Sequence, residues 1–242
     1  MLGTQLVVVS DAHLGAAPKP TEEALLAFLD AAPTLGDCLL VNGDLFHFWF
    51  AYRQVVPRSG FLAAAALAHL RRRMPIVMTG GNHDRWGDSF WDRDMGIIFS
   101  AGEVRFEAAG RRVVALHGDG VAETHWGGAL LHRITKHPFT ARVFGFLHPT
   151  VGFALVGAMS PRLADPGRQD SVLVEAAARQ AEWAGEQIRQ DPTIDLLVLG
   201  HTHRPATGEP EPGRHYLNPG AWIDGQRYAV VTETDIGLRQ WP

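Results

Sequence analysis

Five short apolar runs along the chain each end in a cluster of aspartate, asparagine, histidine and glycine residues. The runs have the length and composition of buried strands, and each cluster follows its run directly. Residues beyond the carboxyl ends of strands converge in open α/β sheets, so we expect the five clusters to meet at one site. The clusters are Ser10-Asp11-Ala12-His13, Asn42-Gly43-Asp44, Gly80-Gly81-Asn82-His83-Asp84, His117-Gly118-Asp119 and Gly200-His201-Thr202-His203.

Helix-like segments alternate with these apolar runs. Residues 21–32, 59–73 and 171–189 have the apolar spacing or composition of helices. Continuous apolar strands that alternate with helices predict an α/β fold, a layered sandwich of two β-sheets flanked by helices. Segment 121–167 breaks the alternation. We therefore interpret residues 1–242 as a single domain with a helical insertion at 121–167.

Composition bears on the kind of binding partner and on the cellular compartment of the protein. The net charge of −4 lacks the basic excess of a nucleic-acid binder, so we expect no stable nucleic-acid partner. Cys38 is the single cysteine, which rules out an intramolecular disulfide and fits a reducing compartment. The sequence shows neither a signal peptide nor a membrane-spanning run. We expect a cytoplasmic protein that can also make peripheral contact with the inner face of the membrane.

The clusters contain the donor atoms of a metal site. Residues two apart in an extended segment point the same way, which pairs Asp11 with His13 and His201 with His203. Carboxylate oxygens, imidazoles and an amide oxygen, without sulfur, suit manganese, iron, zinc or a similar divalent ion. Seven candidates exceed one coordination sphere, so two ions that share Asp44 are the economical arrangement. The candidate ligands are Asp11, His13, Asp44, Asn82, His117, His201 and His203.

The order of the clusters resembles the calcineurin-like metallophosphoesterase family. That family's pattern is Asp-x-His, Gly-Asp, Gly-Asn-His-Asp, His-Gly and Gly-His-x-His, and the match runs from Asp11 to His203. The resemblance implies a hydrolase of phosphoester or anhydride bonds with two divalent ions. Manganese is the metal implied, with iron, zinc and magnesium as alternatives. One ion would be held by Asp11, His13, Asp44 and His203, and the other by Asp44, Asn82, His117 and His201.

The histidine–aspartate pair that remains, His83 and Asp84, is the candidate for proton chemistry. We expect His83 to neutralise charge on the phosphoryl oxygens or to protonate the leaving oxygen, with Asp84 orienting its ring. The alternative is that His83 only supports the metal ligands. His47, which follows the second cluster closely, is a further candidate to face the site.

The residues after Asp44 bear on the substrate. They read Leu45-Phe46-His47-Phe48-Trp49-Phe50, where protein phosphatases of the family have Val-Asp-Arg-Gly. This stretch, with segments 56–58, 117–120, 147–149 and 160–162, resembles the UDP-2,3-diacylglucosamine pyrophosphohydrolases of lipid A biosynthesis. The resemblance implies cleavage of a UDP-sugar lipid to UMP and an acylated sugar 1-phosphate. The chain departs from those enzymes at His83, where they carry arginine, and at Thr124-His125, where they carry acidic residues.

The insertion offers candidate substrate contacts. Its apolar residues would line a groove for acyl chains, or would pack an ordinary helical cap. The basic residues would meet phosphates or anionic lipid headgroups. Arg85 is also a candidate, although an ion pair with Asp88 or Asp92 would explain it equally well. Two alternatives stay open, a general phosphodiesterase or phosphomonoesterase on small nucleotides and a non-catalytic scaffold. The candidate substrate contacts are Arg85, His125, Arg133, Lys136 and Arg162.

Overall fold

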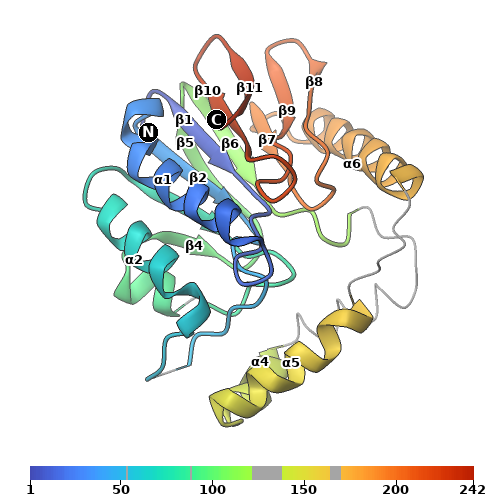
Figure 1. Ribbon diagram of the computed structural model, residues 1–242. Helices are drawn as coiled ribbons and strands as arrows, with labels where there is room; N and C mark the ends of the chain where they lie inside the picture. The colour runs from blue at the N-terminus through green and yellow to red at the C-terminus, as the bar shows by residue number, and fades with distance from the viewer. Residues whose placement is uncertain (53, 88, 122–137, 164–169) are drawn as a thin grey trace.

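A computed structural model describes the chain at residues 1–52, 54–87, 89–121, 138–163 and 170–242. Two β-sheets lie face to face, and helices cover their outer faces (Figure 1). The strand orders are β11-β10-β1-β2-β3-β4 in the six-stranded sheet and β5-β6-β7-β9-β8 in the five-stranded sheet. This arrangement confirms the predicted α/β sandwich of two sheets flanked by helices.

The six-stranded sheet has a parallel part and an antiparallel edge. Strands β1 to β4 are parallel neighbours, and β10 and β11 add antiparallel pairings at the β1 side. The alternation of side chains along β1 buries both faces: Val7 and Val9 pack with the helices, and Leu6 and Val8 pack against the second sheet. The strands are β1 (Leu6–Val9), β2 (Cys38–Asn42), β3 (Ile76–Thr79), β4 (Ile98–Ser100), β10 (Arg227–Val231) and β11 (Ile236–Gln240).

The five-stranded sheet closes the sandwich. Its inner face contributes Val113, Val198 and Leu217 to the core between the sheets. Its outer face packs against α6 (Asp170–Gln190) through Ala184 and Ile188. Its strands are β5 (Val104–Ala108), β6 (Arg111–Ala115), β7 (Leu196–Val198), β8 (Ala206–Glu211) and β9 (Arg214–Asn218).

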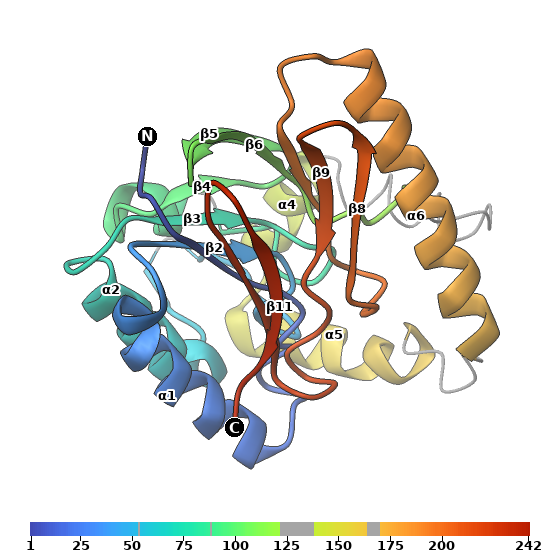
Figure 2. The same ribbon diagram turned by 90° about the horizontal axis from the view of Figure 1, so that it is seen from above.

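The helices complete the layers. Figure 2 shows α1 (Lys19–Leu35) and α2 (Phe61–Leu70) on one side of the sandwich and α6 on the other. Two short helical turns complete the set: η1 (Arg58–Gly60) precedes α2, and η2 (Phe90–Asp94) precedes β4. Among the described residues, no helix has the length and apolar character to cross a membrane.

Two helices fall inside the segment predicted as an insertion. They are α4 (Pro138–Gly145) and α5 (Pro149–Leu163), drawn away from the sheets in Figure 1. The ring of Phe144 from α4 packs against Phe50 and Trp86, with centroids 4.9 and 5.7 Å apart. Phe153 from α5 packs on Phe48 at 5.1 Å. Aromatic side chains therefore join these helices to the loops that follow β2 and β3.

The topology explains why the clusters meet. Strands β1, β2 and β3 are parallel neighbours, so the residues after them leave the sheet at one edge. Strands β6 and β7 are parallel neighbours in the second sheet. The carbonyl of Asn42, at the end of β2, accepts a hydrogen bond from the ring of His117 after β6, at 3.0 Å. The carboxyl ends of both sheets thus meet at the same end of the sandwich.

Candidate metal centre

The candidate ligands gather into compact groups at these strand ends. One group contains Asp11, His13 and His203, and another contains Asp44, His117 and His201, with ligand atoms within 4.8 Å of one another in each. In the first group, His203 Nε2 lies 3.3 Å from His13 Nε2 and 3.4 Å from Asp11 Oδ1. Each group contains ligands of one of the two ion sites that the family resemblance implies.

Asp44 lies between the two groups. Its Oδ2 atom is 3.1 Å from Nε2 of His117 and 3.9 Å from Nε2 of His13. These two histidines belong to different groups, so a single carboxylate reaches both. This is the position that a bridging ligand of two ions occupies.

Among the candidate metal ligands in the described part of the chain, three buried side-chain atoms lack a hydrogen-bond partner. They are Oδ1 of Asn82, Nε2 of His117 and Nε2 of His201, which come from three separate loops. A buried polar atom without a partner costs about 1–3 kcal/mol. All three atoms belong to one of the two predicted ion sites, and a divalent cation satisfies an amide oxygen and two imidazole nitrogens together. The donor set therefore fits a metal ion.

Hydrogen bonds fix which ring nitrogen of His117 faces this site. Nδ1 lies 3.0 Å from the carbonyl oxygen of Asn42, which can only accept, so Nδ1 carries the proton. Nε2 is therefore the ring nitrogen that faces Asp44, at 3.1 Å. Burial works against protonation of His117, but Asp44 and Asp11 outweigh it and hold its pKa well above its usual value. The negative charge of these carboxylates is the charge that a cation would neutralise.

The protonation states of other candidates also suit metal binding. Burial lowers the pKa of His13 and of His201 to about 4, so both rings are neutral near pH 7. Burial alone would raise the pKa of Asp11, but His117 and His203 lower it to about 2. These three side chains therefore offer neutral imidazoles and an ionised carboxylate, the forms that bind metals. In His203 burial works against protonation, but Asp11 and Asp224 outweigh it and raise the pKa to about 10.

The backbone adopts a rare conformation at the site. Asp11, His13, Asp44, His201 and His203 all have positive φ angles, between 49° and 67°. Such a conformation costs of order 1–3 kcal/mol for a residue other than glycine and collects at functional sites. Gly43 allows the loops to approach closely, because a Cβ there would lie 2.5 Å from Nδ1 of His117. The fold holds the candidate ligands in place at an energetic cost.

Residues that the sequence analysis did not identify support the ligands. Nδ1 of His203 lies 2.6 Å from Oδ2 of Asp224, a carboxylate–histidine pair typical of metal sites. On α6, the buried Gln180 donates Nε2 to the carbonyl of Gly200 at 3.0 Å, and Asn218 donates to the same oxygen at 3.1 Å. The run Asn218-Pro219-Gly220-Ala221-Trp222, which precedes Asp224, was the available signal; nothing in the sequence marks Gln180.

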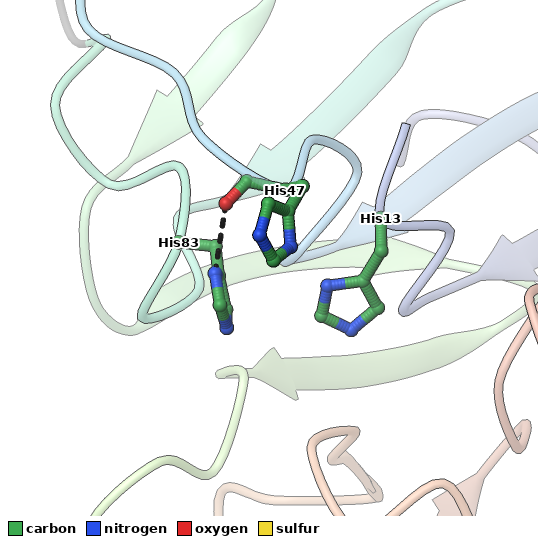
Figure 3. A group of neighbouring side chains, drawn as sticks. All are labelled: His13, His47 and His83. Atoms are coloured by element: carbon green, nitrogen blue, oxygen red, sulfur yellow. Dashed lines mark hydrogen bonds between the residues drawn. The ribbon is translucent and has the colours of Figure 1, made fainter. Parts of the chain in front are cut away.

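The structure corrects the predicted role of Asp84. Its carboxylate accepts backbone hydrogen bonds from Gly81 at 2.8 Å, and from Asp44 and Phe46 at 3.2 Å each. The ring of His83 instead donates Nδ1–H to the carbonyl oxygen of His47, at 2.8 Å (Figure 3). The prediction that Asp84 orients the ring is therefore wrong, because Asp84 is engaged in joining two loops.

Arg85 forms an ion pair with a different aspartate from the two that the sequence analysis considered. Its side chain is 5% exposed and forms an ion pair with Asp119, which is 7% exposed. The ion pair ties the loop after β3 to the loop after β6. The substrate contact predicted for Arg85 stays a prediction.

The other candidate substrate contacts cannot be placed. His125, Arg133 and Lys136 lie outside the described residues. Arg162 falls within α5, but its side chain is outside the described part. Their role stays a prediction.

Comparisons with known proteins find similarity over most of the chain. The sequence profile of the calcineurin-like phosphoesterase family matches residues 4–205. A protein of Porphyromonas gingivalis named UDP-2,3-diacylglucosamine hydrolase is 26% identical over 97% of each chain. A protein of the same name from Klebsiella pneumoniae is 28% identical, over 97% of this chain and 98% of its own. Among solved structures, Vacuolar Protein Sorting 29 from Cryptosporidium parvum has a TM-score of 0.46 and 13% identity over 99% of this chain and 97% of its own.

Proposed function

Because the chain belongs to the calcineurin-like phosphoesterase family and is a hydrolase of phosphoester or anhydride bonds, we propose that it cleaves the pyrophosphate of a UDP-linked acylated sugar. The products would be UMP and an acylated sugar 1-phosphate. The three unpartnered donor atoms beside the bridging position of Asp44 carry the proposal of a dinuclear centre. The name of the curated relatives supports the substrate.

The proposed ligand sets follow the two groups. Asp11, His13 and His203 would hold one ion, and Asn82, His117 and His201 the other, with Asp44 shared. When bound, the two divalent ions would supply a water of lowered pKa and positive charge beside the phosphoryl oxygens. We favour manganese, and iron, zinc or magnesium also suit a donor set of nitrogen and oxygen.

His83 has the geometry of a proton donor. The carbonyl of His47 fixes the proton of its ring on Nδ1, at 2.8 Å. When the ring is protonated, Nε2–H is the donor left for a phosphoryl or leaving oxygen. The ring centroid lies 5.0 Å from that of His13, one of the candidate ligands. This short distance supports the proposal that His83 acts beside the bound phosphoryl group.

An apolar surface on the insertion supports a lipid-linked substrate. Phe139 on α4 is 65% exposed, Phe146 in the turn directly after α4 is 91% exposed, and Val151 on α5 is 55% exposed. The same helices pack through Phe144 and Phe153 onto Phe48, the residue after His47. The exposed apolar side chains are thus joined to the candidate centre by one short segment, and we propose that they contact the acyl chains and the membrane surface.

Hydrolysis of UDP-2,3-diacylglucosamine, compared with that of bis(p-nitrophenyl) phosphate and a cyclic nucleotide, tests this proposal. We expect UMP and a diacylated sugar 1-phosphate by mass spectrometry, with the lipid substrate strongly preferred. Phe146→Ser should lower kcat/KM for the lipid and leave the aryl diester unaffected. Ile98→Ser, at a half-exposed apolar residue of β4, is the matched control. Equal rates on the lipid and on simple diesters would point to a general phosphodiesterase instead.

A further inference from the structure

Three histidines lie together beside the proposed metal centre, and one of them, His47, has no role assigned in that centre. His13, His47 and His83 offer ligand nitrogens within 4.8 Å of one another. Figure 3 shows the three rings together, each from a loop that follows a different strand of the parallel sheet. The rings of His47 and His83 lie nearly parallel, with centroids 5.1 Å apart, and His13 meets His83 edge-on at 5.0 Å. His47 belongs to neither predicted ligand set.

Backbone hydrogen bonds hold this group together. The N–H of His47 donates to the carbonyl of Leu14 at 2.9 Å, next to His13. The N–H of His83 donates to Oδ1 of Asp44 at 2.9 Å, and Trp49 donates to the carbonyl of His83 at 3.2 Å. Each histidine is therefore tied to a loop that carries another, and a ligand would find the three rings already assembled.

The chemistry of the rings points to a metal rather than to an organic ligand. Because Nδ1 of His83 donates to a carbonyl, the neutral ring presents the lone pair of Nε2. The three residues are half-buried, so an ion can reach them from solvent. A set of three imidazoles without a carboxylate suits zinc, copper or nickel, whereas manganese and magnesium prefer oxygen ligands.

We propose that His13, His47 and His83 form an inhibitory site for a zinc-class divalent ion. An ion bound there occupies Nε2 of His83, the atom that the proposed reaction uses as its proton donor. It also competes for His13, which the proposed centre shares with Asp11 and His203. The inhibition rests on the proposed role of His83 and His13, whereas the binding rests on the three rings alone.

Zinc titration of the manganese-loaded enzyme tests the inhibition, with bis(p-nitrophenyl) phosphate as substrate. Each variant is compared with its own zinc-free rate. We expect zinc to inhibit the wild type, and His47→Gln to raise the half-inhibitory zinc concentration by at least about tenfold, since a lost ligand costs no less than a lost outer partner. His69→Gln, at an exposed histidine of α2, is the matched control and should behave as the wild type.

Anomalous diffraction at the zinc edge, from wild-type crystals in excess zinc, locates bound zinc independently of any hydrolase activity. We expect a zinc peak within bonding distance of ring nitrogens of His13, His47 and His83, and no peak there with manganese alone. This measurement also stands if His47→Gln fails to fold. Zinc confined to the two predicted ligand groups, or equal inhibition of the wild type and a folded His47→Gln, would overturn the site. If the manganese-loaded wild type shows no hydrolase activity before zinc is added, the proposed function is contradicted, and the zinc site is not.

Discussion

The carboxylate of Asp44 reaches Nε2 of His117 at 3.1 Å and Nε2 of His13 at 3.9 Å. These two rings come from different sheets, since His13 follows β1 and His117 follows β6. The position of Asp44 therefore depends on the packing of both sheets. It also makes one side chain common to the two candidate ion sites.

His83→Gln should lower turnover while the metal content stays unchanged. Loss of a positioned proton donor costs about 10²–10⁴-fold in rate. The loss should be smaller for an aryl diester with a good leaving group than for an alkyl diester. Steady-state kinetics on both substrates, with metal analysis of the same samples, provides the check. Equal turnover of wild type and variant on the alkyl diester, with metals intact, would remove His83 from the reaction.

Asp224→Asn should weaken metal binding. The carboxylate of Asp224 holds Nδ1 of His203 at 2.6 Å, and loss of such a partner typically costs about 10–100-fold in metal affinity. Competition with a chelator measures that affinity. Asp235→Asn, at an exposed aspartate in the turn between β10 and β11, is the control. If both variants retain wild-type affinity, the pair with His203 has no role in metal binding.

Gln180→Ala should destabilise the folded chain. The Gln180 side chain is fully buried and bonds to the carbonyl of Gly200 and to the amide of Asn218, at 3.0 and 3.1 Å. Its removal leaves buried polar groups short of partners, at a cost of about 1–3 kcal/mol. Urea unfolding of the metal-free protein measures the difference. Glu182→Ala on the same helix is the control, and an equal effect of both would refute a specific role of Gln180.

The contribution of Asp37 to stability should disappear in acid. Partial desolvation would raise its pKa, but hydrogen bonds from the backbone of Gln5 and Thr4 outweigh it and lower the pKa. A lowered folded-state pKa stabilises the fold above the unfolded value, about 3.9, and this contribution is lost as the pH falls through the folded pKa. The difference in Tm between wild type and Asp37→Ala, both metal-free, should therefore shrink below about pH 4. A difference that is constant with pH would contradict this account.

The sequence was informative where strands end in chemically distinctive residues. Asp11, Asp44 and His201 follow continuous apolar runs, so their convergence could be predicted from the topology of α/β sheets. The polar strand β8, Ala206–Glu211, was not predicted, because Pro210 and Pro212 interrupt the pattern at its end and none of its residues is buried. Its pairing with β9 depends on tertiary context, which local patterns do not contain.

The errors concern side chains whose partners are distant in the sequence. Asp84 was paired with its neighbour His83, but it bonds to backbone groups of the loop after β2, about forty residues earlier. Arg85 was compared with nearby aspartates, and its partner is Asp119, 34 residues away. Such contacts follow from the way loops meet at the end of the sandwich. Spacing along the chain does not determine them.

Metal binding by the manganese-reconstituted protein tests the central claim most directly. Equilibrium dialysis with elemental analysis should find two ions per chain in the wild type. In Asp44→Asn, at least one of the two should be lost, because the shared carboxylate contributes to both sites. Asp30→Asn, at an exposed aspartate of α1, should retain both. One ion or none in the wild type, or two ions held equally tightly by Asp44→Asn, would contradict a dinuclear centre bridged by Asp44.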